Sequence, residues 1–346
     1  MKILQIALQS VVVLSVSLLT LSADPIFNVT DLGTLGGLSC AQSINELGQV
    51  VGFSTLPNNQ TRAFVYAQGR MWDLGTLMSG SDSYATAINN KGQVVGTAYA
   101  TGYSHAFLFQ NGQMQDLGTL GGKSSEAHSI NDNGVIVGVA DISSGDQRGF
   151  YYLNNKMFDL GTLGFNSVSS SATYINNNNE ICGIVGNYPD PLAGGHGFIL
   201  RNGTAIDLSV LAAPNAYPRG LSPVAYSNSD LLVGSTAVSR SPGDFKGFVF
   251  DGALHEVSFV PASITETGIV VGTIIPNSLA IGQATVAVIY FQGVTFHLDD
   301  LADLAHSNFT SLQNATGINN SAQIVGAGLT KDGTTHAFLL TLKTSP

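Results

Sequence analysis

The stretch QDLGTLGGKSSEAHSINDNGVIVG, Gln115 to Gly138, holds two short motifs that recur along the chain. One of them, DLGTL, begins at Asp31, Asp73, Asp116 and Asp159. The interval from Asp73 to Asp116 is about 43 residues, within the ~40–45 typical of a four-stranded propeller blade and too long for one turn of a hexapeptide β-helix. The repetition therefore predicts an architecture of equal units.

The number of units follows from two further recurring motifs, the second and third landmarks of the repeat after DLGTL. Each of them occurs seven times. The second landmark, the motif IN..G.VVG, occupies residues 44–52, 88–96, 130–138, 175–183, 226–234, 264–272 and 318–326. The copies at 226–234 and 264–272 match it only in part. A usually basic residue followed by a small and an apolar residue occupies 62–64, 105–107, 148–150, 196–198, 246–248, 286–288 and 336–338. Seven repeats of about 43–48 residues are expected.

One copy, residues 121–163, reads as four strands: SEAHSIN, GVIVGVAD, QRGFYYLN and KMFDLGTL. These runs are rich in β-branched and aromatic residues and are separated by Asn, Gly and Asp, which favour turns. The second strand is almost continuously apolar, so both of its faces must be buried. Blades packed face to face around an axis provide that burial, and each repeat needs its neighbours to cover it.

The two ends of the repeat region complement each other. The chain after His336 supplies three strands of a last blade but lacks the fourth, and residues 26–35 (IFNVTDLGTL) are a fourth strand without the other three. The sequence predicts an all-β, seven-bladed β-propeller of four-stranded antiparallel blades, closed by the N-terminal strand pairing with the C-terminal blade.

Composition and the N-terminus indicate export and exclude several partners. Residues 1–23 have an early Lys, an apolar run and a small-residue end, which predicts a secretory signal peptide; an uncleaved anchor is the alternative. The mature chain, 24–346, is then a single propeller domain, secreted or held in the periplasm or at the cell surface. With 13 Lys and Arg against 23 Asp and Glu, a nucleic-acid partner is not expected, and neither is a membrane span after cleavage.

The chain has two cysteines, Cys40 and Cys182. Export favours a disulfide by default, but the repeat places these residues three blades apart, on opposite sides of the ring. Cys182 occupies a slot that holds Val51, Val95 and Val137 in other copies, so it is expected to be a small buried apolar residue. We therefore predict two unpaired thiols.

The joint presence of His-Ala-Phe at 105–107 and 336–338, DLGTL and IN..GQVVG resembles the HAF-repeat family of probable extracellular bacterial repeat proteins, across residues 26 to 342. The resemblance implies a secreted bacterial repeat protein of largely unassigned activity, and it transfers no catalytic residues. The copies at 246–248 and 286–288 depart from the family pattern.

The histidines in the third landmark invite a metal hypothesis, which the repeat argues against because it spreads them around the ring. A fixed offset to the next Asp instead predicts cross-strand basic-acid pairs on one blade face. These pairs are Arg62 with Asp73, His105 with Asp116, Arg148 with Asp159, and His196 with Asp207. No catalytic, metal-binding or cofactor-binding residues are predicted.

The remaining candidates lie on the face that carries the second-to-third and fourth-to-first strand loops, which vary in length and content. Exposed tyrosines there are candidates for contacting a glycan or a protein: Tyr84, Tyr99, Tyr103, Tyr188 and Tyr217. Loop packing is the alternative role for these rings.

The sequence thus predicts a monomeric binding or scaffold module for an extracellular glycan or protein, without cofactor or catalysis. The alternative is a propeller glycoside hydrolase or polysaccharide lyase, and no carboxylate pair can be chosen for it from the sequence. Three or more polar side chains outside the repeat, converging at the axis, would favour the enzyme. A broad tyrosine-bearing loop face would favour binding.

Overall fold

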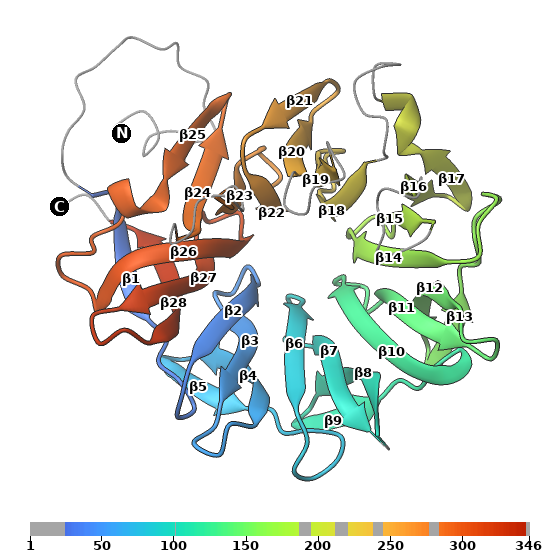
Figure 1. The fold of residues 1–346 in the computed structure, drawn as a ribbon, viewed down its shortest axis with the longest axis horizontal. Coiled ribbons are helices and arrows are strands. Elements are labelled where there is room, and N and C mark those ends of the chain that lie inside the picture. The colour runs from blue at the N-terminus through green and yellow to red at the C-terminus, as the bar shows by residue number, and fades with distance from the viewer. Residues whose placement is uncertain are drawn as a thin grey trace.

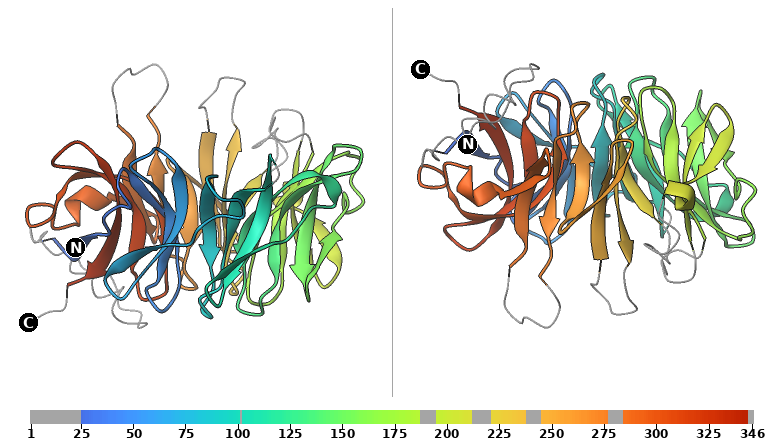
Figure 2. Two further views of the ribbon diagram at one scale, coloured as in Figure 1. Left: turned by 90° about the horizontal axis from the view of Figure 1, so that it is seen from below. Right: turned by 90° about the horizontal axis from the view of Figure 1, so that it is seen from above.

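The computed structural model describes residues 25–100, 102–186, 195–211, 221–237, 245–276 and 284–343. These residues form seven four-stranded antiparallel sheets arranged as a ring about a central axis (Figure 1). Seen from the side, the ring is a flat disc (Figure 2). The predicted seven-bladed β-propeller is confirmed. The predicted signal peptide lies outside the described residues. No helix in the described part of the chain is long and apolar enough to cross a membrane.

Each blade has its first strand next to the axis and its fourth at the rim (Figure 1). Blade 1 contains β2 (Ser39–Ile44), β3 (Val50–Thr55), β4 (Thr61–Ala67) and β5 (Arg70–Asp73). Blade 2 contains β6 (Ser83–Ile88), β7 (Val94–Ala100), β8 (Tyr103–Gln110) and β9 (Gln113–Asp116). Blade 3 contains β10 (Gly121–Ile130), β11 (Ile136–Ile142), β12 (Gln147–Leu153) and β13 (Lys156–Asp159). Blade 4 contains β14 (Ser170–Ile175), β15 (Ile181–Val185), β16 (His196–Arg201) and β17 (Thr204–Asp207).

The remaining blades follow the same order. Blade 5 contains β18 (Ser222–Tyr226), β19 (Leu232–Ala237), β20 (Phe245–Phe250) and β21 (Leu254–Val257). Blade 6 contains β22 (Val260–Ile264), β23 (Val270–Ile274), β24 (Val286–Phe291) and β25 (Val294–His297). Blade 7 contains β26 (Phe309–Ile318), β27 (Ile324–Thr330), β28 (Thr335–Leu342) and β1 (Phe27–Asp31). Two short 3-10 turns, η2 (Leu208–Leu211) and η3 (Leu298–Asp300), follow β17 and β25.

The ring closes as predicted, through the N-terminal strand. β1 pairs antiparallel with β28, from Phe27 opposite Leu342 to Asp31 opposite Phe338. The strand is shorter than the predicted 26–35 because Oδ1 of Asp31 accepts a hydrogen bond from the Gly33 amide at 2.8 Å, which turns the chain out of the sheet. The same turn ends the fourth strand of blades 1 to 3, so LGTL is an exit turn and not part of a strand.

The glycine that ends IN..G.VVG is required by close packing between the first and second strands. A Cβ on Gly96 would lie 2.0 Å from the carbonyl oxygen of Tyr84, closer than real Cβ contacts come. The equivalent glycines of all seven blades meet a carbonyl oxygen at 2.0–2.2 Å: Gly52, Gly96, Gly138, Gly183, Gly234, Gly272 and Gly326. Any side chain at this slot would push the first strand away from the second.

Serine hydroxyls at or near the start of the first strand join successive blades. Ser83 of blade 2 accepts the amide of Ala63 in blade 1 at 2.9 Å and donates to the Gly75 carbonyl at 2.6 Å. Ser39, Ser125 and Ser170 make the same two contacts at three other blade boundaries. The small residue of the third landmark and the glycine of DLGTL therefore both hydrogen-bond to the serine of the next blade.

Asparagines of IN..G.VVG form a second inter-blade connection, here called the asparagine belt: Asn45, Asn89, Asn131, Asn176 and Asn319. Oδ1 of Asn89 accepts the amides of Lys91 and Gln93, and Nδ2 donates to Gln93 Oε1 at 2.8 Å and to the carbonyl of Asn131 in the next blade at 2.9 Å. All four hydrogen-bonding positions of the side chain are therefore used. The other belt members repeat the inter-blade contact at 3.0–3.1 Å.

The next residue of each motif closes a complete circle, here called the mouth ring: Glu46, Asn90, Asp132, Asn177, Asn228, Glu266 and Asn320. Each backbone amide in the circle donates to the side-chain oxygen of the following blade, at 2.7–3.2 Å. Blade 7 returns to blade 1 through the Asn320 amide and Glu46 Oε1. Three carboxylates are therefore held at one mouth of the axis by structural hydrogen bonds.

Candidate functional site

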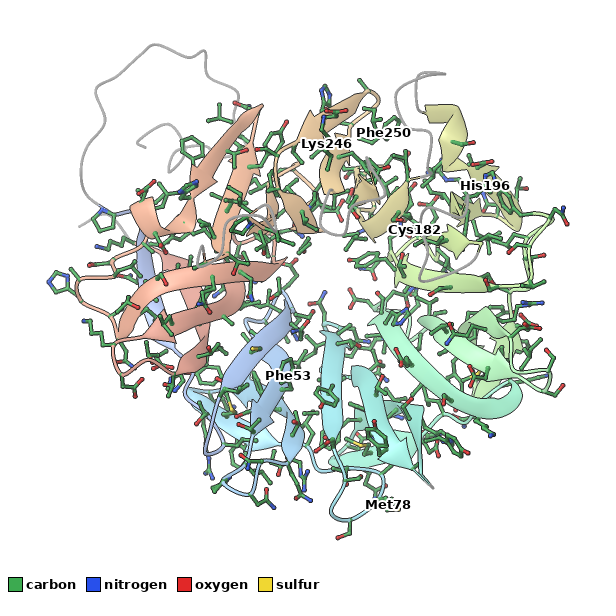
Figure 3. All side chains as sticks on the ribbon, in the orientation of Figure 1. Phe53, Met78, Cys182, His196, Lys246 and Phe250 are labelled. Atoms are coloured by element: carbon green, nitrogen blue, oxygen red, sulfur yellow. The ribbon has the colours of Figure 1, made fainter. Side chains whose placement is uncertain are left out.

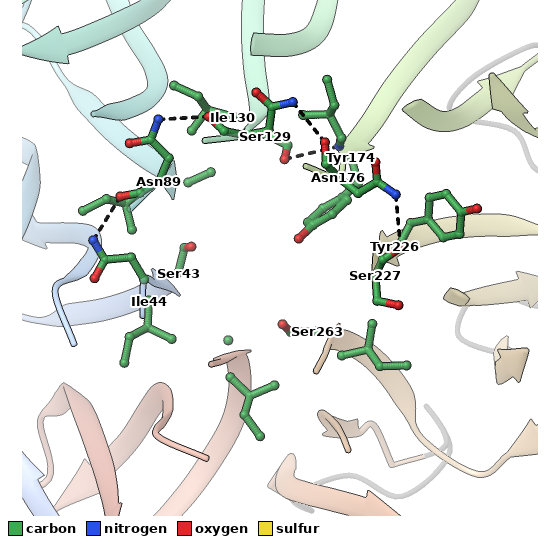
Figure 4. A pocket seen from close by; sticks show the side chains of 18 of the residues that line it. Ser43, Ile44, Asn89, Ser129, Ile130, Tyr174, Asn176, Tyr226, Ser227 and Ser263 are labelled. Carbon is green, nitrogen blue, oxygen red and sulfur yellow. Dashed lines mark hydrogen bonds between the residues drawn. The ribbon is translucent and has the colours of Figure 1, made fainter. Parts of the chain in front are cut away.

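A cavity of about 500 Å³ runs along the axis, lined by the first strands of all seven blades (Figure 4). Its shape depends on a β-bulge in each first strand, which sets one extra residue against the second strand. The seven extra residues all line the cavity: Gln42, Thr86, His128, Thr173, Val224, Ala262 and Thr316.

Four of these bulge residues hydrogen-bond to the following blade. The hydroxyls of Thr86, Thr173 and Thr316 donate to carbonyl oxygens of the following blade at 2.8, 2.9 and 3.0 Å. His128 takes the same role through Nδ1, which donates to the Ala172 carbonyl at 2.8 Å. Its other ring nitrogen, Nε2, lies 3.9 Å from Glu126 Oε2. The neighbouring His128 imidazole lowers the pKa of Glu126, against the opposing effect of burial.

The next position along the strands contributes Tyr174, which extends toward the centre of the cavity (Figure 4). Burial raises the pKa of this phenol to about 12, so it is a neutral hydrogen-bonding group at ordinary pH. Ser43 and Ser263 also point toward the cavity (Figure 4). Sequence reasoning missed Gln42, His128 and Tyr174, although aligning the repeat columns at the residues before IN marks each as a departure.

The predicted tyrosine face lies elsewhere, at the loop end of blade 2. Tyr84, Tyr99 and Tyr103 are 36%, 44% and 42% exposed, at the ends of β6, β7 and β8 that lie on the same edge of the blade. Tyr84 packs edge-on against Phe53 of blade 1, with ring centroids 5.4 Å apart. Lys123 Nζ of blade 3 lies 5.2 Å from the Tyr103 ring. The other two candidates, Tyr188 and Tyr217, lie outside the described residues.

Further exposed apolar side chains lie in loops on the same face: Leu38, Met78, Val168 and Ile275. The opposite face carries Leu47 in a first-to-second strand turn and Val294 after a third-to-fourth strand turn, and the rim strands β5 and β17 carry Trp72 and Ile206. Exposed apolar and aromatic groups are therefore concentrated on the face with variable loops.

The basic-acid pairs form in most of the predicted positions. Nδ1 of His105 is 2.8 Å from Asp116 Oδ2, and Nδ1 of His196 is 3.0 Å from Asp207 Oδ2. Arg62 Nε lies 3.8 Å from Asp73 Oδ2. The pair Arg148 with Asp159 is wrong for the described chain: Arg148 donates to the Gln147 carbonyl instead, and Asp159 holds the amide of Gly161.

Two more pairs occur in slots that the sequence did not assign to them. His336 contacts Asp31 at 2.9 Å across the closure between β28 and β1. Lys246 contacts Glu256 at 2.7 Å in blade 5. His196 and Lys246 lie in the outer parts of separate blades (Figure 3), so these side chains belong to local pairs. Within the described ranges, no group of three or more His, Cys, Asp or Glu side chains is placed to hold a metal ion.

A charged cluster outside the repeat lies between blades 4 and 5. Arg201 of blade 4 contacts Glu180 of its own blade and Asp230 and the Tyr226 hydroxyl of blade 5. It links blades 4 and 5 beside the belt contact from Asn176 to the Ser227 carbonyl, and the belt is interrupted at the next boundary, where blade 5 has Ser227 in the asparagine slot. Glu180 also accepts a hydrogen bond from Asn176 Nδ2, and the Tyr226 hydroxyl donates to Asp230, so the cluster has a structural role.

Cys40 and Cys182 are free thiols, in blades 1 and 4. Cys182 is fully buried inside its blade (Figure 3). Burial raises its pKa to about 12, while the contact with the Thr173 hydroxyl opposes this shift. Burial also raises the pKa of Cys40. Neither thiol is placed as a nucleophile, which would need a lowered pKa.

Comparisons with known proteins bear on the fold alone. No family model matches the chain, and no curated protein is significantly similar to it in sequence. The β-propeller domain of the Trilobed protease from Pyrococcus furiosus is similar in structure, with a TM-score of 0.53 and 11% identity over 92% of this chain and 98% of that one. Pyrococcus horikoshii acylaminoacyl peptidase also has a TM-score of 0.53, with 9% identity over 89% of this chain.

The chain spans about half the length of some of these structures: 52% of the acylaminoacyl peptidase and 53% of TolB from Acinetobacter baumannii. For TolB the TM-score is 0.45, with 14% identity over 62% of this chain. At such identities the likeness establishes a β-propeller and no activity.

Proposed function

We propose that this chain is an exported bacterial propeller of the HAF-repeat type that acts as a non-catalytic binding module for an extracellular glycan or protein. The three exposed tyrosine rings at one edge of blade 2 carry the proposal. Tyrosine presents a broad apolar ring and a polar tip at low entropic cost, which suits both sugar stacking and protein contacts.

The repeat supports binding rather than catalysis because its recurring polar residues are already used in holding blades together. The carboxylates near the axis, Glu46, Asp132 and Glu266, each accept a backbone amide of the preceding blade. The loop face, by contrast, differs from blade to blade, and its tyrosines are attached to the ends of regular strands. A rigid scaffold with a variable face is the usual arrangement of a binding surface.

The test is a screen of the purified chain on arrays of glycans and bacterial surface proteins. Tyr99→Ala and Tyr103→Ala should each weaken binding to the ligand found, about tenfold or more if the ring is a central contact, since such contacts cost at least ~1.4 kcal/mol. Trp72→Ala is the matched control, because Trp72 is 48% exposed but lies on the rim. Equal losses in all three variants would contradict the assignment of this face.

A polysaccharide lyase or glycoside hydrolase is the second candidate, because Gln42, His128 and Tyr174 are three polar side chains outside the repeat in one axial cavity. A lyase needs one group to remove a proton and another to donate one, and His128 and Tyr174 have suitable chemistry. A hydrolase needs a carboxylic acid with a raised pKa, whereas the pKa of Glu126 is lowered. Release of reducing ends or unsaturated sugars from polysaccharides, lost in His128→Ala, would support an enzyme.

A further inference from the structure

The axial cavity contains polar side chains that the architecture leaves without partners. In the described part of the chain, the Gln42 amide, the Ser43 and Ser263 hydroxyls and the Tyr174 phenol make no hydrogen bond to protein. The asparagine belt and the bulge threonines next to them are, in contrast, hydrogen-bonded. Half-buried polar groups without protein partners are available to water or a ligand.

These groups come from different sides of the ring. Gln42 and Ser43 belong to blade 1, Tyr174 to blade 4 and Ser263 to blade 6. Figure 4 shows Ser43, Tyr174 and Ser263 directed toward one space between them. Hydroxyl groups both donate and accept, so the set suits a ligand that itself carries several hydroxyls.

The charge and size of the cavity narrow the ligand class. Among the residues that the structure describes, no Lys or Arg lines the cavity and its carboxylates lie at the mouth ring, so a phosphate or carboxylate ligand is disfavoured. Apolar contacts come from Val224 and Ala262 on the side away from His128. A volume of about 500 Å³ is within the range of small-molecule sites.

We propose that the axial cavity binds a neutral carbohydrate unit, through hydrogen bonds with Tyr174, Ser43, Ser263 and Gln42 and with Nε2 of His128, which accepts because Nδ1 donates to the Ala172 carbonyl. The site is separate from the tyrosine face of blade 2, and its occupancy does not depend on that face. The two polar sides of the cavity would hold opposite edges of a sugar ring, with Val224 and Ala262 against its C–H surface.

The probes are glucose, galactose, mannose, fucose and xylose, each tested with the purified chain by saturation-transfer NMR and titration calorimetry. At least one should bind. Tyr174→Phe, which keeps the ring, and the double variant Ser43→Ala with Ser263→Ala should each weaken binding about three- to tenfold, as expected for loss of one or two hydrogen bonds. Ala262→Leu should abolish binding by filling the cavity. The variant should fold, because the larger residues Gln42 and His128 occupy the same slot in other blades.

Trp72→Ala, on the rim strand of blade 1, serves as the control and should bind the sugar as the unaltered chain does. Binding that is weakened in Tyr99→Ala and unchanged in Tyr174→Phe would belong to the tyrosine face and would also overturn the proposal. The proposal is overturned if none of the five sugars gives saturation transfer with the unaltered chain, and this test needs no variant. It is also overturned if folded Tyr174→Phe and Ala262→Leu variants bind normally, or if glucose 6-phosphate binds more tightly than glucose.

Discussion

Nδ2 of Asn89 donates a hydrogen bond to the backbone carbonyl of Asn131 at 2.9 Å, joining blade 2 to blade 3. The same side chain holds its own turn through Oδ1 and is itself held by Gln93. One residue of the repeat therefore fixes both the turn within a blade and the contact between blades. This dual role explains why the Asn and the Gln recur together.

Asn89→Ala should lower the free energy of unfolding by about 2–4 kcal/mol, because it leaves two backbone amides and the Asn131 carbonyl without their partners in a mostly buried site. Urea unfolding followed by circular dichroism measures the change. Lys91→Ala, in the same turn but exposed, should stay within about 0.5 kcal/mol of the unaltered chain. Similar stability of the two variants would show that the belt contributes little.

The interruption of the belt in blade 5 allows a test by gain of stability. Ser227 Oγ accepts the amides of Ser229 and Leu231 but has no group to donate to blade 6. Leu231 of blade 5 is next to Gly268 of the following blade. Gln93 of blade 2 is next to Gly134 of its following blade in the same way, so Leu231 occupies the position of the belt glutamine. Ser227→Asn with Leu231→Gln should restore the link to the Thr265 carbonyl and raise stability by about 0.5–1.5 kcal/mol.

Ser227→Asn alone is the control for this gain, and it should give less, because its second N–H lacks the Gln acceptor. Thermal melting of both variants provides the comparison. A double variant no more stable than the single one would mean that the Gln slot does not position the amide.

Gly96→Ala tests the requirement for glycine after the apolar pair of the second strand. The new Cβ would lie 2.0 Å from the Tyr84 carbonyl, so the first strand must shift, and we expect a loss of about 3 kcal/mol or more, or insoluble protein. Gly195→Ala is the matched control, because its Cβ would meet Ile184 Cγ2 at an ordinary 3.4 Å. Soluble yield and urea midpoint should separate the two, and equal behaviour would exclude a steric cause.

Seven repeats, the strand order and the closure could be predicted because each repeat carries its own turn and strand signals. The pairing of Phe107 opposite Asp116 follows from the two-residue turn at Asn111 and is observed. The axial cavity could not be predicted, because it depends on a bulge that adds one residue per first strand. Alignment of the repeats shows that His128 departs from Thr86 and Thr173, but its place in the cavity follows only from the bulge. Arg148 shows the limit of the repeat, since its long side chain finds a nearer acceptor than Asp159.

Deleting residues 24–35 tests the closure of the ring. The deletion removes fully buried Phe27 and leaves the edge of β28 unpaired, so the chain should lose stability and associate with other copies. Light scattering after size-exclusion chromatography measures the association. A synthetic peptide of residues 24–35 should restore the monomer, and a scrambled peptide should not. A truncated chain that stays monomeric with an unchanged melting temperature would contradict this role for β1.

Cys182 predicts a specific response to alkaline pH. Burial raises its pKa to about 12 in the folded chain, above the ordinary 9.0 that the thiol regains on unfolding. The folded state therefore keeps its proton where the unfolded state loses it, so this contribution to stability is complete below pH 9.0 and is lost as the pH rises toward 12. Tyr174, the cross-strand partner of Cys182, has a pKa raised to about 12 from 10.0 and adds to the same loss. Cys182→Val, the residue found in this slot in other blades, should reduce the fall in urea midpoint between neutral and alkaline pH. A fall of equal size in both chains would show that the Cys182 thiol is not the group responsible.

Alkylation gives an independent readout of the burial of Cys182. The native thiol should react far more slowly than the same thiol in denaturant, where two thiols per chain should be counted.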